Sequence, residues 1–473
     1  MNRQPDNSVS AAAGAPLASR GPRDMTRISR REFLKASGAG VVAAATPLTG
    51  LTQMVAPAGS FSDYRALVCV FLFGGNDSYN MLVPRSDAEY NVYSRSRQNL
   101  ALNRADLLPI SPLTQDGAQY GLHPTMGAIQ TLFDSARVAF IANVGPLIEP
   151  TTKEQYENET VALPPRLFSH NDQQAQWQSL RGRAPGKTGW AGRIGDLLRQ
   201  HVSEQQLATN VSLAGNQLFQ AADETVAYTM GRNGPLNFQG LGDAERARQR
   251  RDAFRQILGA EYDSMYERAY RDIQQRAVET VDRVTAALEY AQPLSTAMPP
   301  SGLGQQLSTV ARLISVREQL QMQRQIFFVS TGGFDSHDDH LERQPPLLSD
   351  ISESVSAFYQ ATVELGVASS VTTFTQSDFG RTLTSNGDGT DHGWGGVQFV
   401  VGDAVRGREL YGRYPRLEIG GPDDVRRGRL IPSVSADQYA ATLAKWIGVP
   451  DADLGHVAPH LDNFAQRDLG FLI

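Results

Sequence analysis

Short runs of apolar and β-branched residues recur along the chain, and most of them end in small or polar residues. Uninterrupted apolar runs of this length are typical of strands buried in a largely parallel sheet, because both faces of such strands are covered. The pattern therefore predicts strands at these segments: Leu67–Phe73, Val138–Ala142, Asn210–Leu213, Ile326–Val329, Val371–Thr375 and Val397–Val401.

Between these runs lie segments in which apolar residues recur at helical spacing. Strands that alternate with helices predict an α/β fold, with helices covering both faces of the sheet. We therefore expect a three-layer sandwich with a mostly parallel central sheet. The predicted helices are Pro124–Ser135, Trp190–His201, Gln306–Gln323, Leu348–Leu365 and Ala436–Ile447.

One long segment departs from this alternation. Asp243–Glu289 is dense in Arg, Glu, Gln and Ala, contains no strand pattern, and ends near the Pro/Ser/Gly stretch Pro293–Gly304. It predicts a helical insertion over about residues 243–300. Two interpretations remain open, a lid or cap over a site and a solvated helical pair that flanks the sheet.

The first 58 residues have the composition of an export signal. The charged segment Ser29–Lys35 (SRREFLK) is followed by a stretch of small and apolar residues to about Leu51, and then by Ala56-Pro57-Ala58, an A-x-A cleavage pattern. The pair Arg30-Arg31 resembles a twin-arginine signal. We expect the export machinery of that pathway as a partner, a periplasmic or secreted protein, and a single domain over residues 59–473; Met25 is an alternative start.

Composition narrows the classes of function. The chain has 473 residues, a net charge of −6 and one cysteine, Cys69, which excludes an internal disulfide and every multi-cysteine zinc site. Residues 1–58 hold seven Lys/Arg and three Asp/Glu, so the remainder carries −10 and is a poor candidate for binding nucleic acid. No apolar run reaches the roughly 20 residues that span a bilayer, so we expect no membrane span in the mature chain.

Polar residues follow three of the predicted strands directly. Asp77 follows the first, Asp335 and His337 follow the strand that ends near Val329, and Asp378 follows the strand that ends near Thr375. The loop after Asp378 carries further polar residues, namely Arg381, Asp391 and His392. Because ligands of open α/β sheets bind at the carboxyl ends of the strands, we expect these side chains to meet.

Clustered carboxylates repel one another, and a buried set is stable only when cations neutralise it. Carboxylate oxygens with imidazole nitrogens suit zinc, manganese or a similar divalent ion, and two such ions can hold both oxygens of a displacement at phosphorus or sulfur. His337 and His392 are the favoured ligands, with His340 in reserve. Each motif alone also fits an ordinary turn or a solvated loop.

Ser169 and His170 open a polar helical stretch after the second strand. A serine at a helix start is first of all an N-cap. The alternative is a nucleophile, because the same helix N-terminus can face an oxyanion and activate the hydroxyl.

Six motifs occur in the order found in a known family: SRREFLK, FLFGGNDSYNMLVP, SHNDQQAQW, STGGFDSHDDH, SDFGRTLTSNGDGTDHGWGG and the tail Pro459–Phe464. Together they resemble the exported bacterial family called domain of unknown function 1501, from about Ala66 to Phe471. That family is grouped with the alkaline phosphatase-like superfamily. The resemblance implies an alkaline phosphatase-like fold and hydrolysis or transfer of phosphate or sulfate esters with two divalent metals.

The resemblance also implies roles for single residues. Asp77 resembles the first metal-binding aspartate, and Ser169 the nucleophile with His170 beside it. Arg381 resembles a residue that clamps an ester oxygen. The implied metal ligands after the later strands are Asp335 and His337 for one ion, Asp378 for the other, and the late His392.

Two departures from the superfamily pattern matter. Phe379 stands where a histidine usually follows the aspartate, so one ligand is missing unless Asp391 or His340 replaces it. The chain also lacks the Cys/Ser-x-Pro-x-Arg signature of formylglycine sulfatases, and Cys69 lies within a predicted strand. We therefore do not expect a typical sulfatase mechanism, and the second metal is in question.

Three functions remain open at this point. The first is an exported hydrolase of phosphate-type esters, sulfate esters included, in a small molecule or a polymer, with one or two ions of zinc, manganese, calcium or magnesium. The second is a non-catalytic metal- or glycan-binding protein on the same fold, which the missing histidine at Phe379 favours. The third is a serine esterase that uses the Gly74–Asp77 block with Asp453 and His456, although such enzymes carry their nucleophile motif on an earlier strand.

Overall fold

The computed structural model describes residues 61–114, 117–183, 186–236 and 245–473. The predicted signal segment, residues 1–58, lies outside the described residues, and the division of the chain into a signal and one domain stays a prediction. Among the described helices, none is both long and apolar enough to cross a membrane.

The centre of the fold is a nine-stranded sheet with the order β13-β5-β12-β9-β1-β8-β6-β7, in which β14 also pairs with β5. Every pairing is parallel except those of β12, which runs antiparallel to β5 and β9. All six predicted strands are confirmed. The strands are β1 (Arg65–Leu72), β5 (Val138–Gly145), β6 (Asn210–Ser212), β7 (Tyr228–Thr229), β8 (Arg324–Thr331), β9 (Val371–Ser377), β12 (Gly396–Val401), β13 (Glu409–Tyr411) and β14 (Val434–Ser435).

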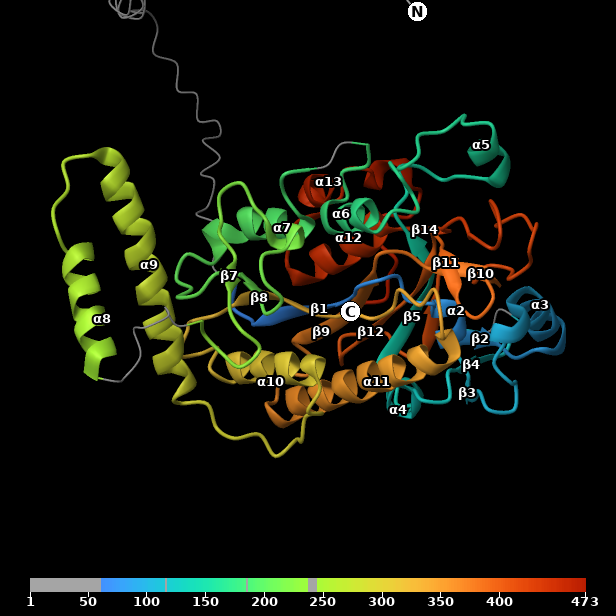
Figure 1. The fold of residues 1–473 in the computed structure, drawn as a ribbon, viewed down its shortest axis with the longest axis horizontal. Helices are drawn as coiled ribbons and strands as arrows, with labels where there is room; N and C mark the ends of the chain where they lie inside the picture. The colour runs from blue at the N-terminus through green and yellow to red at the C-terminus, as the bar shows by residue number, and fades with distance from the viewer. Residues whose placement is uncertain (1–60, 115–116, 184–185, 237–244) are drawn as a thin grey trace, which may run out of the picture. The chain divides into compact units, whose positions relative to one another are not determined.

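Successive side chains of β1 enter opposite cores, as the pleat of a strand requires. Val68 and Val70 belong to one hydrophobic core, and Leu67 and Cys69 to the other. Figure 1 shows helices on both faces of the sheet, which confirms the α/β sandwich. One face is covered by α4 (Gly127–Asp134), α10 (Gly302–Ser315) and α11 (His340–Glu364), and the other by α6 (His170–Ser179), α7 (Trp190–Leu198), α12 (Ala436–Ile447) and α13 (Leu454–Val457).

The ends of α12 show why this helix forms where the sequence predicts it. The Ser435 hydroxyl accepts hydrogen bonds from the backbone N–H groups of Asp437 and Gln438, and the Gln438 side chain accepts one from the backbone of Ser435. This capping box satisfies donors that the first turn leaves free. Gly448 ends the helix in the left-handed region, with a φ of 119°.

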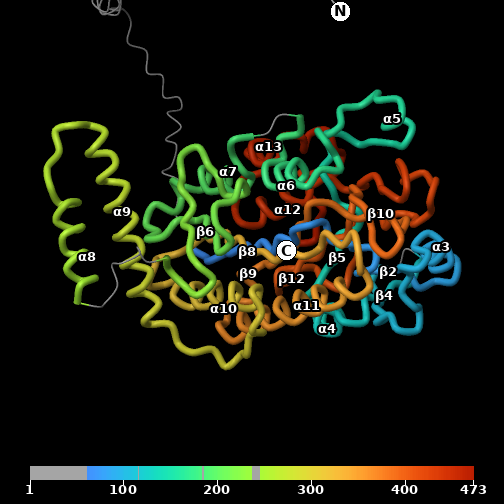
Figure 2. Tube along the Cα trace, viewed as in Figure 1, coloured from blue at the N-terminus to red at the C-terminus, as the bar shows by residue number. Residues whose placement is uncertain are grey.

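Smaller elements surround the sheet. Two helices, α8 (Glu245–Leu258) and α9 (Met265–Leu288), occupy the predicted insertion, and most of their side chains are exposed. The α3 helix (Asp87–Arg97) packs beside β10 (Arg381–Ser385), as Figure 2 shows. The remaining α-helices and strands are α2 (Ser78–Met81), α3 (Asp87–Arg97), α5 (Lys153–Glu157), β2 (Leu82–Pro84), β3 (Leu108–Ile110), β4 (Tyr120–Leu122), β10 (Arg381–Ser385) and β11 (Thr390–His392).

The register of three central strands positions the site. In β1, Leu72 pairs with Thr331 of β8 on one side and with Ser377 of β9 on the other. The three strands therefore end at the same level, and the residues that follow each of them emerge side by side at the carboxyl edge of the sheet.

Candidate metal centre

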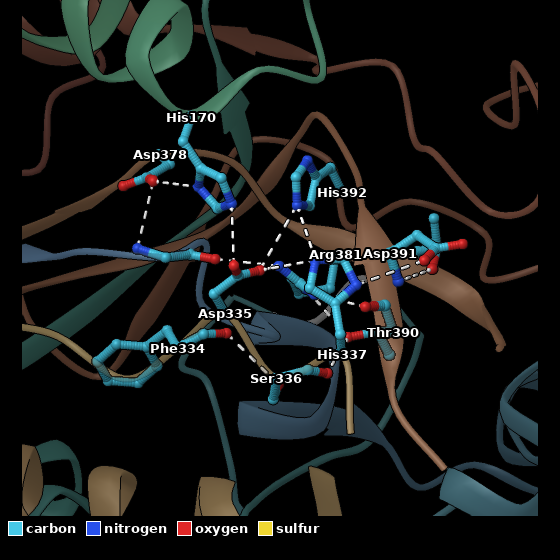
Figure 3. A network of polar contacts seen from close by, with 12 residues as sticks. His170, Phe334, Asp335, Ser336, His337, Asp378, Arg381, Thr390, Asp391 and His392 are labelled. Atoms are coloured by element: carbon cyan, nitrogen blue, oxygen red, sulfur yellow. Dashed lines mark hydrogen bonds and ion pairs between the residues drawn. The ribbon is translucent and has the colours of Figure 1, made fainter. Parts of the chain in front are cut away.

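Four side chains from three separate segments meet at this edge (Figure 3). His170 is the first residue of α6, Asp335 and His337 follow β8, and His392 ends β11. Their ligand atoms are close: His337 Nε2 lies 2.9 Å from Asp335 Oδ1 and 3.0 Å from His392 Nε2. His170 Nε2 lies 3.3 Å from Asp335 Oδ2, and His392 Nε2 lies 3.5 Å from Asp335 Oδ1.

The other nitrogen of each imidazole faces an acceptor. His170 Nδ1 lies 2.7 Å from Asp378 Oδ2, and His392 Nδ1 lies 2.7 Å from the carbonyl oxygen of Phe168. Because a carbonyl can only accept, His392 carries its proton on Nδ1 and directs the lone pair of Nε2 into the site. His337 Nδ1 lies 3.5 Å from Asp391 Oδ1.

The Oδ2 atom of Asp378 is directed at groups around the cluster and not at its centre. Its Oδ2 atom accepts hydrogen bonds from Gln174 Nε2 at 2.9 Å and from the backbone N–H of Gly74 at 3.2 Å, in addition to His170. The carboxylate is fully buried, and it supports His170 from behind. Asp391 has the same position behind His337 and forms an ion pair with Arg427 at 2.9 Å.

Arg381, the first residue of β10, is buried and engaged with protein groups. Its Nη1 donates to Asp335 Oδ1 at 2.7 Å and to the carbonyl of Gly74 at 3.0 Å. Its Nε donates to Thr390 Oγ1 at 3.0 Å, and its Nη2 donates to the carbonyl of Thr390. The guanidinium therefore orients Asp335, and its predicted contact with an ester oxygen stays a prediction.

The charges of the cluster act on one another. Partial burial opposes the ionisation of Asp335, but the hydrogen bond and charge of Arg381, with smaller contributions from His170 and His337, outweigh it and lower the pKa of Asp335. The hydrogen bond to Asp378 raises the pKa of His170, whereas burial lowers the pKa of His392. The cluster thus holds an ionised carboxylate among imidazoles of different basicity.

Phe379 fills the space beside two of the imidazoles. Its ring centroid lies 4.8 Å from that of His170 and 4.8 Å from that of His392, and the side chain is buried. Gly75 makes this packing possible, because a Cβ atom there would come within 2.4 Å of the Phe379 ring. Position 379 therefore contributes an apolar wall and no ligand.

Asp77 lies in a neighbouring buried cluster rather than among these four side chains. It forms an ion pair with Arg97 of α3, and His340 Nε2 lies 3.0 Å from its Oδ2 atom. Ser336 Oγ lies 2.7 Å from His340 Nδ1. The metal-binding role predicted for Asp77 stays a prediction.

Ser169 occupies the N-cap position of α6, but its hydroxyl makes no capping hydrogen bond to the backbone. It donates instead to Asp172 Oδ2 at 2.6 Å. Ser169 thus stands at the N-cap position without capping the helix through its hydroxyl. Its role as a nucleophile stays a prediction.

Sequence reasoning missed three contributors to the two clusters. Gln174 follows His170 by four residues, a spacing that places both on one face of α6, so this signal could have been found. The carbonyl of Phe168 is a backbone group, which no side-chain pattern reveals. Arg97 lies in α3, 20 residues after Asp77, and its sequence context is that of an ordinary surface helix.

The donor set fits a transition-metal ion. His170 Nε2 is buried and has no hydrogen-bond partner among the described residues, and the ligand atoms of His170, Asp335 and His392 all lie within 4.8 Å of one another. Ligand bonds of about 2.05 Å in a tetrahedron place neighbouring ligand atoms about 3.3 Å apart, close to the separations that Asp335 makes with His170 and with His392. His337 lies outside this group of three and approaches only Asp335 and His392. Imidazole nitrogens with a carboxylate oxygen suit zinc better than calcium or magnesium.

Fold and site together define an α/β protein whose central strands carry imidazoles and carboxylates to one edge of a mostly parallel sheet. Residues 64–427 match the family described as protein of unknown function DUF1501, and the chain belongs to that family. Residues 27–47 match the twin-arginine translocation signal, so this is a periplasmic or secreted protein exported by that route. Both predictions are confirmed. No curated protein matches the sequence significantly.

Several solved structures are similar at low identity. The lipoteichoic acid synthase LtaP from Listeria monocytogenes matches at 7% identity and a TM-score of 0.35, over 83% of this chain and 74% of its own. The PsFucS1 sulfatase from Pseudoalteromonas sp. matches at 10% and 0.30, over 82% and 68%. A mutant of the alkaline phosphatase PafA matches at 9% and 0.30, over 68% and 64%. At these TM-scores nothing about function follows from the similarity.

Proposed function

We propose that this protein is an exported metal-dependent hydrolase of phosphate-type esters, sulfate esters included. The observation that supports it most is the convergence of three Nε2 atoms on the Asp335 carboxylate, with the Nδ1 atoms of His170 and His392 directed at acceptors. Imidazoles held in this way are typical of metal ligands whose outer nitrogen is fixed by a second group. His170, Asp335, His337 and His392 would hold the ion.

A bound divalent cation supplies a Lewis acid that draws electron density from the ester oxygen. The chain's own residues do the rest. Asp335 balances part of the positive charge, and Arg381 fixes the orientation of that carboxylate. Ser169 is the proposed nucleophile: its Oγ would bond to phosphorus while the bond to the leaving alcohol breaks, and its hydroxyl proton would pass to Asp172 Oδ2, to which it already donates. Water would then hydrolyse the serine ester and release the acid.

The direct test combines metal analysis with a substrate panel. Protein exported from cells is analysed for bound metal and assayed on phosphomonoesters, phosphodiesters and sulfate esters, beside Asp335→Ala and Ser169→Ala. We expect bound metal and turnover in the wild type, loss of both in Asp335→Ala, and loss of turnover alone in Ser169→Ala. Absence of both metal and turnover from the wild type would contradict the proposal.

A non-catalytic binding protein is the second candidate, and the contacts of two side chains favour it. Arg381 donates its N–H groups to Asp335, Gly74 and Thr390, which are protein groups and not substrate. Phe379 packs against the imidazoles at the position where the superfamily pattern has a metal ligand. Phe379→His restores that ligand. On this second hypothesis the variant gains ester hydrolysis that the wild type lacks, whereas indifference to the change counts against it.

A further inference from the structure

The second buried cluster, around Asp77, already contains a cation from the chain itself. The side chains of Asp77 and Arg97 are both fully buried, and they form an ion pair. Burial opposes the ionisation of Asp77, but Arg97 and His340 outweigh it and lower the pKa of Asp77 to about 2. The carboxylate is therefore ionised, and its charge is balanced inside the protein.

The guanidinium of Arg97 donates hydrogen bonds to several acceptors of the protein. Its Nε donates to Asn80 Oδ1 at 3.1 Å, and its Nη1 donates to the carbonyls of Thr382 at 2.9 Å and Leu383 at 3.3 Å. Asn80 is itself held, because Tyr93 donates to the same Oδ1 atom at 2.8 Å. These contacts with α2 and β10, together with the ion pair to Asp77, hold the guanidinium in the cluster.

The resemblance to two-metal enzymes implies an ion at Asp77, and the cluster does not fit one. A divalent ion bound to Asp77 would lie a few ångströms from a buried guanidinium, where repulsion between the charges is only weakly screened. Asp77 Oδ1 and His340 Nε2 have no hydrogen-bond partner among the described residues. His340 Nε2 lies 3.0 Å from the same Asp77 oxygen that Arg97 pairs with, so these two side chains offer at most two ligand atoms beside a buried cation. In the described part of the chain, the one group of three ligand side chains is that of His170, Asp335 and His392.

We propose that Arg97 acts as a fixed cation in place of a second metal ion at Asp77, so that each folded chain binds one divalent ion, at the cluster of Asp335. This inference rests on the proposed function in so far as the first site binds a metal. It changes the role of Asp77, which becomes the counter-ion of Arg97 and not a metal ligand.

Zinc stoichiometry tests the proposal without any assay of turnover. Wild-type exported protein is saturated with Zn²⁺, and bound zinc is counted by native mass spectrometry beside two matched carboxylate-to-amide variants, Asp77→Asn and Asp335→Asn. We expect one zinc per chain in the wild type and in Asp77→Asn, with affinities within about twofold. In Asp335→Asn we expect an affinity loss of about 100-fold or more, beyond the loss caused by removing an outer partner.

Two zinc ions in the wild type would overturn the proposal, and so would an affinity loss in Asp77→Asn as large as that in Asp335→Asn. The wild-type count decides the question even if Asp77→Asn fails to fold, and Arg97→Lys, which keeps the charge, should then also bind one ion. Absence of the first metal site gives a different result, since no zinc would then bind to any of these proteins.

Discussion

A single acceptor behind each ring determines which nitrogen of His170 and of His392 faces the site. Asp378 and the carbonyl of Phe168 take the Nδ1 side of His170 and His392, so that the Nε2 atoms are left to face Asp335. The Nε2 atoms of His337 and His392 lie 3.0 Å apart. Two lone pairs at this distance repel each other unless a cation or a proton lies between them. This repulsion is the physical reason to expect a bound cation here.

Replacing Asp378 by asparagine should loosen this arrangement without removing a ligand. The amide is a weaker acceptor than a carboxylate for His170 Nδ1, and loss of such an outer partner lowers metal affinity by about 10- to 100-fold. Zinc affinity measured by competition with a chelator checks this, with the exposed Asp338→Asn as the control for charge. Equal affinities in the two variants would show that Asp378 does not support the site.

The buried carboxyl of Asp437 should make the stability of the fold depend on pH, independently of the metal centre. Burial raises the pKa of this carboxyl to about 7, against opposing effects of the hydrogen bond from the His460 backbone and the charge of Arg193. The folded state therefore keeps a proton that the unfolded state releases. The contribution of Asp437 to the free energy of unfolding is complete below about pH 4. It is lost as the pH rises to about 7, by roughly 1.4 kcal/mol per pH unit.

Asp437→Asn removes that loss, because the amide stays neutral and still accepts from the His460 backbone. Urea unfolding at pH 5 and pH 8 measures this effect. Relative to the wild type, the free energy of unfolding of the variant should rise by up to a few kcal/mol at the higher pH. Asp106→Asn, an exposed position, serves as control. A gain of the same size at both pH values would refute the assigned titration.

At the scale of elements, the loops after β1 and β8 approach each other closely. Gly74 has a φ of 114°, and a Cβ atom built there would lie 2.4 Å from the backbone nitrogen of Asp335. Only glycine satisfies both conditions, the left-handed backbone and the close contact. The position of Asp335 in the site therefore depends on a residue that makes no contact through a side chain.

Gly74→Ala should destabilise the fold more than Gly366→Ala. Gly366 also has a positive φ, 68°, but no atom lies within 4 Å of its built Cβ. Each substitution costs about 1–3 kcal/mol of backbone strain, and Gly74→Ala adds the steric clash. Urea unfolding of the two variants measures the difference, and equal losses of stability would mean that the loops can separate freely.

The strands were predictable from the sequence because burial on both faces leaves continuous apolar runs, as in β1 and β8. The start of α11 was not: the apolar pattern predicts Leu348, whereas the helix begins at His340 and contains Pro345 and Pro346. Prolines lack the N–H that an interior turn needs, so local reasoning places the helix after them. Tertiary packing, such as the buried contacts of His340 and Gln344 with Asp77, outweighs that local preference.

The candidate site was predictable in part. Strand ends indicated Asp335, His337 and His392, since the topology of parallel sheets brings such residues together. His170 was assigned as the neighbour of a nucleophile, because nothing in the sequence shows that the start of α6 faces the loop after β8. Arg97 could not be assigned at all, since its pairing with Asp77 depends on how α3 packs against β10.

For the whole molecule, the twin-arginine signal and the chemistry of the site agree. Proteins that use this route cross the membrane folded, so a metal can be bound before export. The single cysteine, Cys69, is buried within β1, which is consistent with folding in a reducing compartment. The chain's remaining means of holding a cofactor are histidines and carboxylates, and these meet at one edge of the sheet.

Anomalous scattering from crystals of the exported protein, grown with zinc and measured at the zinc absorption edge, would show where metal binds. We expect one strong peak per chain, bounded by His170, Asp335, His337 and His392, and no peak beside Asp77. Absence of a peak within that cluster would contradict the proposed metal centre.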